Sequence, residues 1–210
     1  MISTRHNRSL FKYLIIGIGL LLFSAGYSIP AVEADQRLQY YEAINPDKNF
    51  QLTDQNGAPF ELKDHQGKVI LLFFGYLSCP DVCPVTLSKV SRVYQQLTES
   101  EREQVLTVFI SVDTYRDTPD KIKEYLSYFG INAVGLTGEQ MDIDFIVEDF
   151  DAWYQIVQSS SALGYLIDHT SYVYLLDREG NVRYLFRPED DVKHMTNIIR
   201  KIYQAKSPAS

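Results

Sequence analysis

The chain has little of what proteins that bind nucleic acids or phosphates require. Its 210 residues contain 20 Lys and Arg against 27 Asp and Glu, which gives a formal net charge of −7. Nucleic-acid-binding proteins usually present a basic patch or stripe, and this charge balance argues against one. The sequence also contains no glycine-rich motif of the kind that cradles phosphates. We therefore do not expect a polyanionic ligand.

Cysteine is equally scarce, because Cys79 and Cys83 are the only two in the chain. Neither lies in or directly after the apolar stretch near the N-terminus, which excludes a lipoprotein anchor. The sequence shows no internal repeat. With 45% hydrophobic and 13% aromatic residues, the chain can bury a substantial core. Its length suits one domain plus an accessory segment.

A basic segment precedes an apolar stretch at the N-terminus. Residues 1–12 carry three basic residues and no acid, and residues 13–29 contain no ionisable group other than two tyrosines. Since basic flanks stay in the cytoplasm, we predict a cytoplasmic segment over 1–12 and a transmembrane signal anchor over 13–29. Cleavage near residues 32–34 is the alternative. A buried core helix is a third interpretation, which the basic flank disfavours.

Residues 30–49 are predicted to be a polar linker, and residues 50–205 a single domain. Hydrophobic periodicity and turn signals predict its elements. The expected strands are 50–53, 59–62, 68–75, 105–112, 171–177 and 182–186. The expected helices are 84–97, 119–129, 139–154 and 189–203, and residues 158–164 are expected to form a loop.

The order of these elements predicts the fold class. A helical crossover joins strands 68–75 and 105–112, so the two must be parallel, whereas the last two strands form an antiparallel hairpin. With a cysteine pair directly after the first long strand, this order describes an α/β, thioredoxin-like sandwich, in which helices flank a central mixed sheet. Its site is expected at the carboxyl ends of the strands, where open α/β sheets bind ligands.

The cysteine pair stands where the buried strand turns into a helix, in the sequence SCPDVCP at residues 78–84. We expect Pro84 to be the first helical residue, which places Cys83 near the N-cap and Cys79 in the preceding loop. A helix N-terminus favours thiolate over thiol, and soft thiolates select copper(I), zinc or iron–sulfur centres. The Cys-x-x-x-Cys spacing differs from the Cys-x-x-Cys of disulfide oxidoreductases. A structural disulfide is the alternative, although closing so small a loop stabilises little.

Two thiolates are too few for a zinc site, which usually needs three or four protein ligands. The chain has four histidines that could supply another. His6 precedes the apolar stretch, His65 lies at the far end of the first long strand, and His194 lies on the last helix. His169 stands where the serine-rich loop leads into a core strand, on the expected ligand face. The competing interpretation of His169 is a hydrogen-bonded structural residue.

Five sequence blocks, in order and at compatible spacing, resemble the Sco/SenC family of copper chaperones over about residues 50–203. The blocks are FGY at 74–76, CPDVCP at 79–84, SVD at 111–113 with RDTP at 116–119, GLTG at 135–138 and DHTS at 168–171. The departures are small: Leu77 stands before the motif where many members have a polar residue, and the loop at 158–164 varies within the family.

The resemblance implies that copper, as Cu(I) or Cu(II), is bound by Cys79, Cys83 and His169. It also implies a role in cytochrome c oxidase assembly, so the expected partner is oxidase subunit II or another copper or redox client. Asp81 and Asp168 are interpreted as groups that support the ligands or cap elements. An N-terminal membrane anchor is common in this family. The short apolar span favours a location in the bacterial inner membrane, with the domain in the periplasm.

A second function uses the same two cysteines. Cycling between dithiol and disulfide would make the protein an extracytoplasmic thiol–disulfide oxidoreductase that reduces client cysteines, and thioredoxin-like folds support both activities. A peroxidase is less favoured, because peroxide chemistry needs a single activated thiolate beside an arginine. The sequence favours a metallochaperone, which has no catalytic residue to assign, over an enzyme, with thiol–disulfide reductase activity as the alternative.

Overall fold

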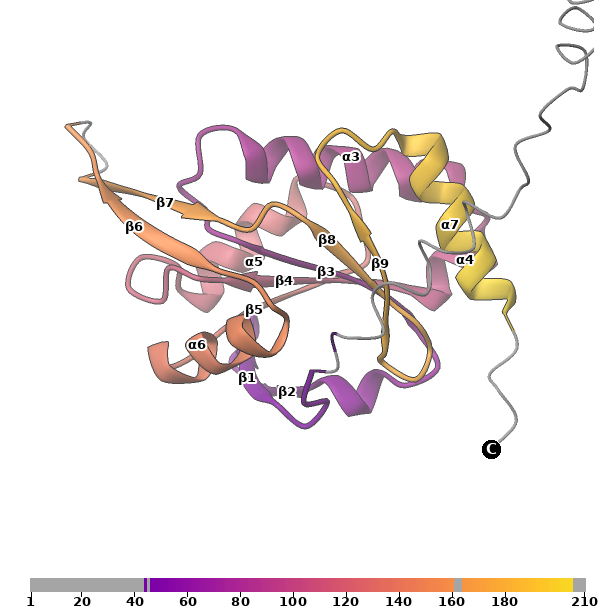
Figure 1. Ribbon diagram of the computed structural model, residues 1–210, viewed down its shortest axis with the longest axis horizontal. Coiled ribbons are helices and arrows are strands. Elements are labelled where there is room, and N and C mark those ends of the chain that lie inside the picture. The colour runs from indigo at the N-terminus through magenta and orange to yellow at the C-terminus, as the bar shows by residue number, and fades with distance from the viewer. Residues whose placement is uncertain (1–43, 45, 161–163, 206–210) are drawn as a thin grey trace, which may run out of the picture. The chain divides into compact units, whose positions relative to one another are not determined.

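The computed structural model describes residue 44, residues 46–160 and residues 164–205 (Figure 1). The predicted cytoplasmic segment, the predicted transmembrane anchor and most of the predicted linker lie outside the described residues. None of the helices in the described ranges combines the length and the apolar character that a membrane span requires.

A mixed sheet of seven strands forms the centre of the domain, in the order β2-β1-β5-β4-β3-β8-β9 (Figure 1). The central strands β3, β4 and β5 are parallel, and the outer pairings are antiparallel. This confirms the predicted α/β class. The strands are β1 (Gln51–Asp54), β2 (Pro59–Glu61), β3 (Val69–Gly75), β4 (Val105–Ser111), β5 (Ala133–Thr137), β8 (Val173–Leu176) and β9 (Val182–Phe186).

The two central strands end at the same level of the sheet. β3 and β4 are buried along their whole length, which fits their nearly continuous apolar sequences. Their register pairs Val69 with Val105 and Gly75 with Ser111. The loops that follow Gly75 and Ser111 therefore emerge side by side at the carboxyl edge, where the cysteine pair was expected.

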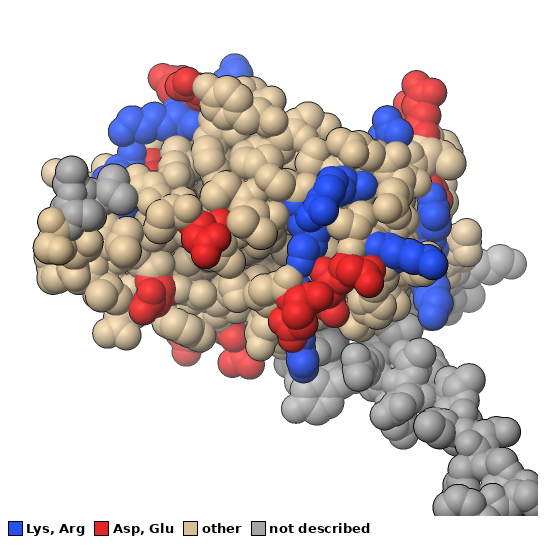
Figure 2. All heavy atoms as spheres, turned by 90° about the horizontal axis from the view of Figure 1, so that it is seen from above, with Lys and Arg blue, Asp and Glu red and all other residues tan. Residues whose placement is uncertain are grey.

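Helices cover both faces of the sheet. Side chains alternate between the faces along a strand, so Phe73 and Phe74 point in opposite directions. On the Phe73 side, Phe109 of β4 contacts Tyr125 of α5, whereas on the other side Phe74 contacts Phe150 at the end of α6. Basic and acidic side chains are interspersed over the face shown in Figure 2. The helices are α3 (Val82–Gln96), α4 (Glu99–Gln104), α5 (Pro119–Ser127), α6 (Gln140–Asp149) and α7 (Val192–Gln204), with a short 3-10 helix, η2 (Leu62–His65).

Three strands were missed: β5 in the main sheet, and two others that change the surroundings of the histidine. The helix predicted over 139–154 ends at Asp149, and Asp151 then takes a left-handed conformation with φ 50°. Beyond that turn, β6 (Tyr154–Gln158) and β7 (Tyr165–His169) pair as a separate antiparallel sheet, the β6–β7 ribbon. The loop predicted at 158–164 begins at the last residue of β6, and its residues 161–163 lie outside the described residues.

Several element boundaries also differ from the prediction. α3 begins at Val82 rather than Pro84, so Cys83 lies inside the first helical turn. Proline is tolerated there because the first N–H groups of a helix have no intrahelical partner. The short helix α4 was not predicted. Its N-cap Thr98 forms a capping box with Glu101, which satisfies N–H groups at the start of α4.

Candidate metal centre

Cys79 lies in the loop between β3 and α3, and this loop is tied to the end of β4. The Cys79 N–H donates to the Tyr76 carbonyl over 3.3 Å. The Leu77 N–H donates to Asp117 over 2.9 Å, and the Ser111 hydroxyl donates to the same carboxylate oxygen over 2.6 Å. Burial raises the pKa of Asp117, while these two donors favour its charged form. Asp117 therefore anchors the cysteine loop to the end of β4.

Cys83 projects from the first turn of α3 into the core. Its residue is fully buried, and its sulfur lies against the backbone of Gly75, where an added Cβ would come within 2.8 Å of Sγ. The Cys83 N–H points at the Cys79 sulfur, with 3.5 Å between N and Sγ. A helix N-terminus thus presents a donor to one cysteine while holding the other in place.

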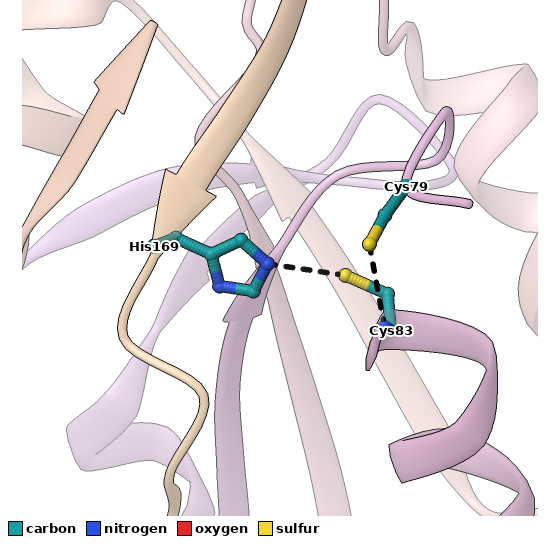
Figure 3. Close-up of side chains that lie close together, drawn as sticks. All are labelled: Cys79, Cys83 and His169. Atoms are coloured by element: carbon teal, nitrogen blue, oxygen red, sulfur yellow. Dashed lines mark hydrogen bonds between the residues drawn. The ribbon is translucent and has the colours of Figure 1, made fainter. Parts of the chain in front are cut away.

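His169 is the last residue of β7, and the ribbon brings it over the cysteine pair (Figure 3). Its Nε2 lies 3.4 Å from the Cys83 sulfur, and its Nδ1 lies 2.9 Å from the Thr170 carbonyl oxygen. A carbonyl oxygen can only accept, so Nδ1 carries a proton, and Nε2 is the ring nitrogen that faces the thiols and could bind a metal. Phe73 and Tyr76 meet the imidazole edge-on, each at 5.9 Å between ring centroids.

The three side chains converge closely enough for one metal ion. Within the described part of the chain, Cys79, Cys83 and His169 form one potential ligand group, with all ligand atoms within 4.8 Å of one another. First-row ions bind thiolate at about 2.3 Å and imidazole at about 2.0 Å, so the ligand atoms of one ion lie up to about 4.6 Å apart, which is close to the separation found here. The two cysteines are not joined by a disulfide. Two sulfurs and an imidazole nitrogen suit soft or borderline metals such as copper.

The two thiols differ in their protonation. Hydrogen bonding from Cys83 lowers the pKa of Cys79, against the opposing effect of burial, and His169 and backbone N–H groups lower it further. The hydrogen bond to Cys79 and burial together raise the pKa of Cys83. Without metal, these shifts favour the thiolate form of Cys79 and the thiol form of Cys83. Binding a metal through both sulfurs requires Cys83 to release its proton.

The other histidines and acidic residues considered from the sequence do not join the ligand group in the described part of the chain. The ring of His65 stacks on Phe60, with centroids 4.6 Å apart, and Nε2 of His194 lies 2.9 Å from the hydroxyl of Tyr184. Asp81 is the exposed N-cap residue of α3 and makes no side-chain cap bond. Asp168 is exposed, because it alternates with His169 along β7 and faces away from the thiols. His6 lies outside the described residues.

Three residues around the site were not predicted as functional. Tyr76 follows β3, and its hydroxyl accepts the Ile167 N–H over 3.2 Å. The guanidinium of Arg116 lies over the Tyr165 ring, with 3.6 Å from Cζ to the centroid. Tyr76 and Arg116 fall inside blocks of the family resemblance, but contacts between distant segments give no signal in a single sequence.

Fold and site together define a class of protein. A thioredoxin-like sheet that presents two thiols and one imidazole at the carboxyl ends of its parallel strands is built for metal or thiol chemistry. The model of the SCO1/SenC family matches residues 39–204 of the chain. The protein therefore belongs to the SCO1/SenC family.

Individual relatives agree with this assignment. The SCO2-like protein of Rickettsia conorii is 33% identical over 189 residues, which cover 89% of this chain and 92% of the relative. The structure of Bradyrhizobium japonicum ScoI with copper bound is 35% identical, with a TM-score of 0.67 over 75% of this chain and 98% of that one. Yeast Sco1 with copper bound is 30% identical, with a TM-score of 0.69 over 79% and 90% of the two chains.

Proposed function

We propose that this protein is a copper chaperone that binds copper through Cys79, Cys83 and His169. The observation that carries the proposal is that two sulfurs and one imidazole nitrogen lie within 4.8 Å of one another. They come from three parts of the fold: the loop after β3, helix α3 and strand β7. Two relatives of 30% identity or more have structures with copper bound, which supports copper as the metal.

The protonation of the site suits transient binding. Cys79 offers a thiolate at once, and it is only partly buried, so a recipient's ligand can approach the metal from its side. Cys83 joins by releasing a proton, and His169 supplies the nitrogen. Two thiolates are sufficient for soft copper(I), whereas copper(II) favours the added imidazole. Replacing these ligands one at a time would hand the ion to a partner with a similar set.

The proposed partner is the copper centre of cytochrome c oxidase subunit II, which would receive the metal during oxidase assembly. The proposed location is the bacterial inner membrane, with residues 13–29 as a single-pass anchor, residues 30–49 as a linker and the domain from residue 50 in the periplasm. The basic flank at residues 1–12 and the apolar stretch after it support this orientation. Another extracytoplasmic copper or redox client would suit the same site.

The test replaces the nitrogen ligand. His169→Ala should weaken copper(II) binding about 10–100-fold or more and copper(I) binding far less, because the two thiolates remain. Competition titration with a chelator for each oxidation state measures both affinities. His194→Ala is the matched control, since it removes an imidazole that contacts Tyr184 instead of the thiols. Equal loss of both oxidation states in His169→Ala would contradict the ligand assignment.

One observation favours a second function, a thiol–disulfide oxidoreductase. The partly exposed thiolate of Cys79 beside the buried thiol of Cys83 is the asymmetry that disulfide exchange needs. Cys79 would attack a client disulfide and release one client thiolate. Cys83 would then lose its proton and attack Cys79, so that the client leaves as a dithiol and the pair as a disulfide.

Copper stoichiometry and reduction potential separate the two functions. One tightly bound copper per chain in the purified, reduced protein supports the chaperone. Absence of copper binding, together with turnover of a disulfide substrate, would overturn it in favour of the oxidoreductase.

A further inference from the structure

The seven-stranded sheet does not hold the histidine of the site. β6 and β7 form a two-stranded sheet of their own, and in the described residues neither pairs with a strand of the main sheet. Cys79 and Cys83, by contrast, follow directly from the central strand β3. Figure 1 shows the β6–β7 ribbon extending beyond the main sheet. The distance from the imidazole to the sulfurs therefore depends on the side chains that connect the ribbon to the sheet.

Arg116 connects β7 to the loop after β4. Its Nη1 donates to the Tyr165 carbonyl over 3.1 Å, and its guanidinium lies on the ring of the same residue at 3.6 Å from the centroid. The Tyr165 hydroxyl donates over 2.7 Å to Asp113, whose other carboxylate oxygen accepts from Nε of Arg116. Arg116 and Asp113 belong to the loop after β4. Tyr165 is therefore held by its backbone, its ring and its hydroxyl.

Tyr76 extends this connection to the metal ligands. Its ring lies 5.8 Å from Cζ of Arg116 and meets the His169 ring edge-on, and its hydroxyl accepts the N–H of Ile167. Tyr165, Ile167 and His169 alternate along β7, so their side chains share one face of the strand. The same face thus carries the restraint at one end and the nitrogen ligand at the other.

We propose that Arg116, held by Asp113 and seated on Tyr165, is a positioning residue that keeps His169 over the two thiols. Resting on the proposed function, the inference adds that Arg116 raises the affinity of the site for copper(II) more than its affinity for copper(I). Without this restraint the ribbon samples positions in which the imidazole is withdrawn. Copper(I) then keeps its two thiolates, whereas copper(II) loses the nitrogen that it favours.

The test uses the full chain in detergent and compares three variants with a control. Arg116→Gln removes the guanidinium, but it leaves Asp113 as a buried carboxylate, only 3% exposed. The double variant Asp113→Asn/Arg116→Gln removes both charges, which avoids a buried unpaired anion. Arg116→Lys keeps the charge and loses the planar fork and the stacking. Arg92→Gln is the control, because Arg92 is exposed on α3.

Two measurements, hydrogen exchange and copper affinity, test whether Arg116 holds the ribbon in place. Hydrogen exchange of the metal-free protein should show β7 amides, including that of Ile167, exchanging about tenfold faster in the double variant, with β3 and β4 unchanged. Copper(II) affinity should fall about 10–100-fold, as for other groups that orient metal ligands, while copper(I) affinity changes less than about threefold. Arg116→Lys should fall between wild type and Arg116→Gln, and Arg92→Gln should match wild type.

Three other outcomes would each contradict one part of the proposal. Unchanged exchange of β7 in both Arg116→Gln and the double variant would overturn the positioning role, whatever the metal does. Faster exchange with equal loss of both copper states would overturn the effect on copper preference. If wild type binds no copper, the proposed function fails, and the exchange of β7 still decides whether Arg116 holds the ribbon.

Discussion

Replacing Gly75 with alanine tests whether the end of β3 leaves room for the Cys83 sulfur. An added Cβ would lie 2.8 Å from Cys83 Sγ, 2.9 Å from Cε2 of Phe109 and 3.0 Å from Cε1 of Phe73. Ordinary van der Waals contact begins at 3.4 Å, so the sulfur must move by 0.6 Å, which is 3.4 minus 2.8. Phe73 and Phe109 are buried in the core and cannot yield easily.

The magnitude follows from overpacking, which typically costs about 1–3 kcal/mol in a well-packed core. For a chain of this size, that loss lowers Tm by about 2–12 °C, measured by circular dichroism on the metal-free protein. Because a displaced sulfur is a ligand in both oxidation states, Gly75→Ala should weaken copper(I) and copper(II) together, by about tenfold or more. This differs from the copper(II)-selective loss expected for His169→Ala.

Gly138→Ala is the matched control for this experiment. Its Cβ would lie 2.7 Å from Cδ2 of Leu52, a comparable clash on the side of the sheet where β1 and β5 pair. We expect a similar loss of Tm and unchanged copper affinity. Copper binding of Gly75→Ala equal to that of wild type would refute the argument that Gly75 makes room for the sulfur. Equal weakening of copper in both variants would show that general destabilisation explains the effect.

Two further predictions concern protonation and stability. Iodoacetamide should modify Cys79 of the metal-free protein at nearly the same rate at pH 5.5 and 7.5, because its pKa is lowered, whereas an ordinary thiol slows about tenfold per pH unit below its pKa of about 8.5. The Cys79 thiolate stabilises the fold fully above the unfolded-state thiol pKa, and this stabilisation is lost as pH falls through the lower folded-state pKa. Faster modification of Cys83 than of Cys79, or an ordinary pH profile for Cys79, would contradict the assignment of Cys79 as the thiolate. Tyr94→Phe should lower the free energy of unfolding in urea by about 1–3 kcal/mol, because the buried hydroxyl donates to two backbone carbonyls and accepts from the hydroxyl of Thr107. Tyr128→Phe, at an exposed position, should change it by less than about 0.5 kcal/mol. Equal effects of the two tyrosine variants would refute the role of the buried hydroxyl.

The local sequence pattern was sufficient to predict the two central strands of the sheet, β3 and β4. The apolar runs at β3 and β4 could be interpreted from residue type alone, and the helical crossover between them required a parallel pair. The hairpin of β8 and β9 followed from its turn residues. The prediction missed β5 and failed at residues 150–154, where acidic and apolar residues continue a helical pattern across Asp151. One left-handed residue ends that helix, and no periodicity reports such a turn.

The candidate site divides in the same way. The spacing and position of Cys79 and Cys83 indicated reactive ligands. Position singled out His169 among the four histidines, and the resemblance to a known family implied that it is a ligand. The residues that hold the histidine in place were not predicted. Arg116 and Tyr165 are 49 residues apart, and their contact exists only because the ribbon folds back over the loop after β4.

The amino-acid sequence alone determined which groups are available: two thiols at the end of a buried strand, one histidine on a later segment, and a parallel sheet whose carboxyl edge collects its loops. Only the tertiary structure decided which histidine nitrogen faces the sulfurs and which thiol keeps its proton. Both depend on burial and on hydrogen bonds between segments distant in the chain, such as the contact of Cys83 with His169. Those interactions form only when the separate β6–β7 ribbon is placed against the central sheet.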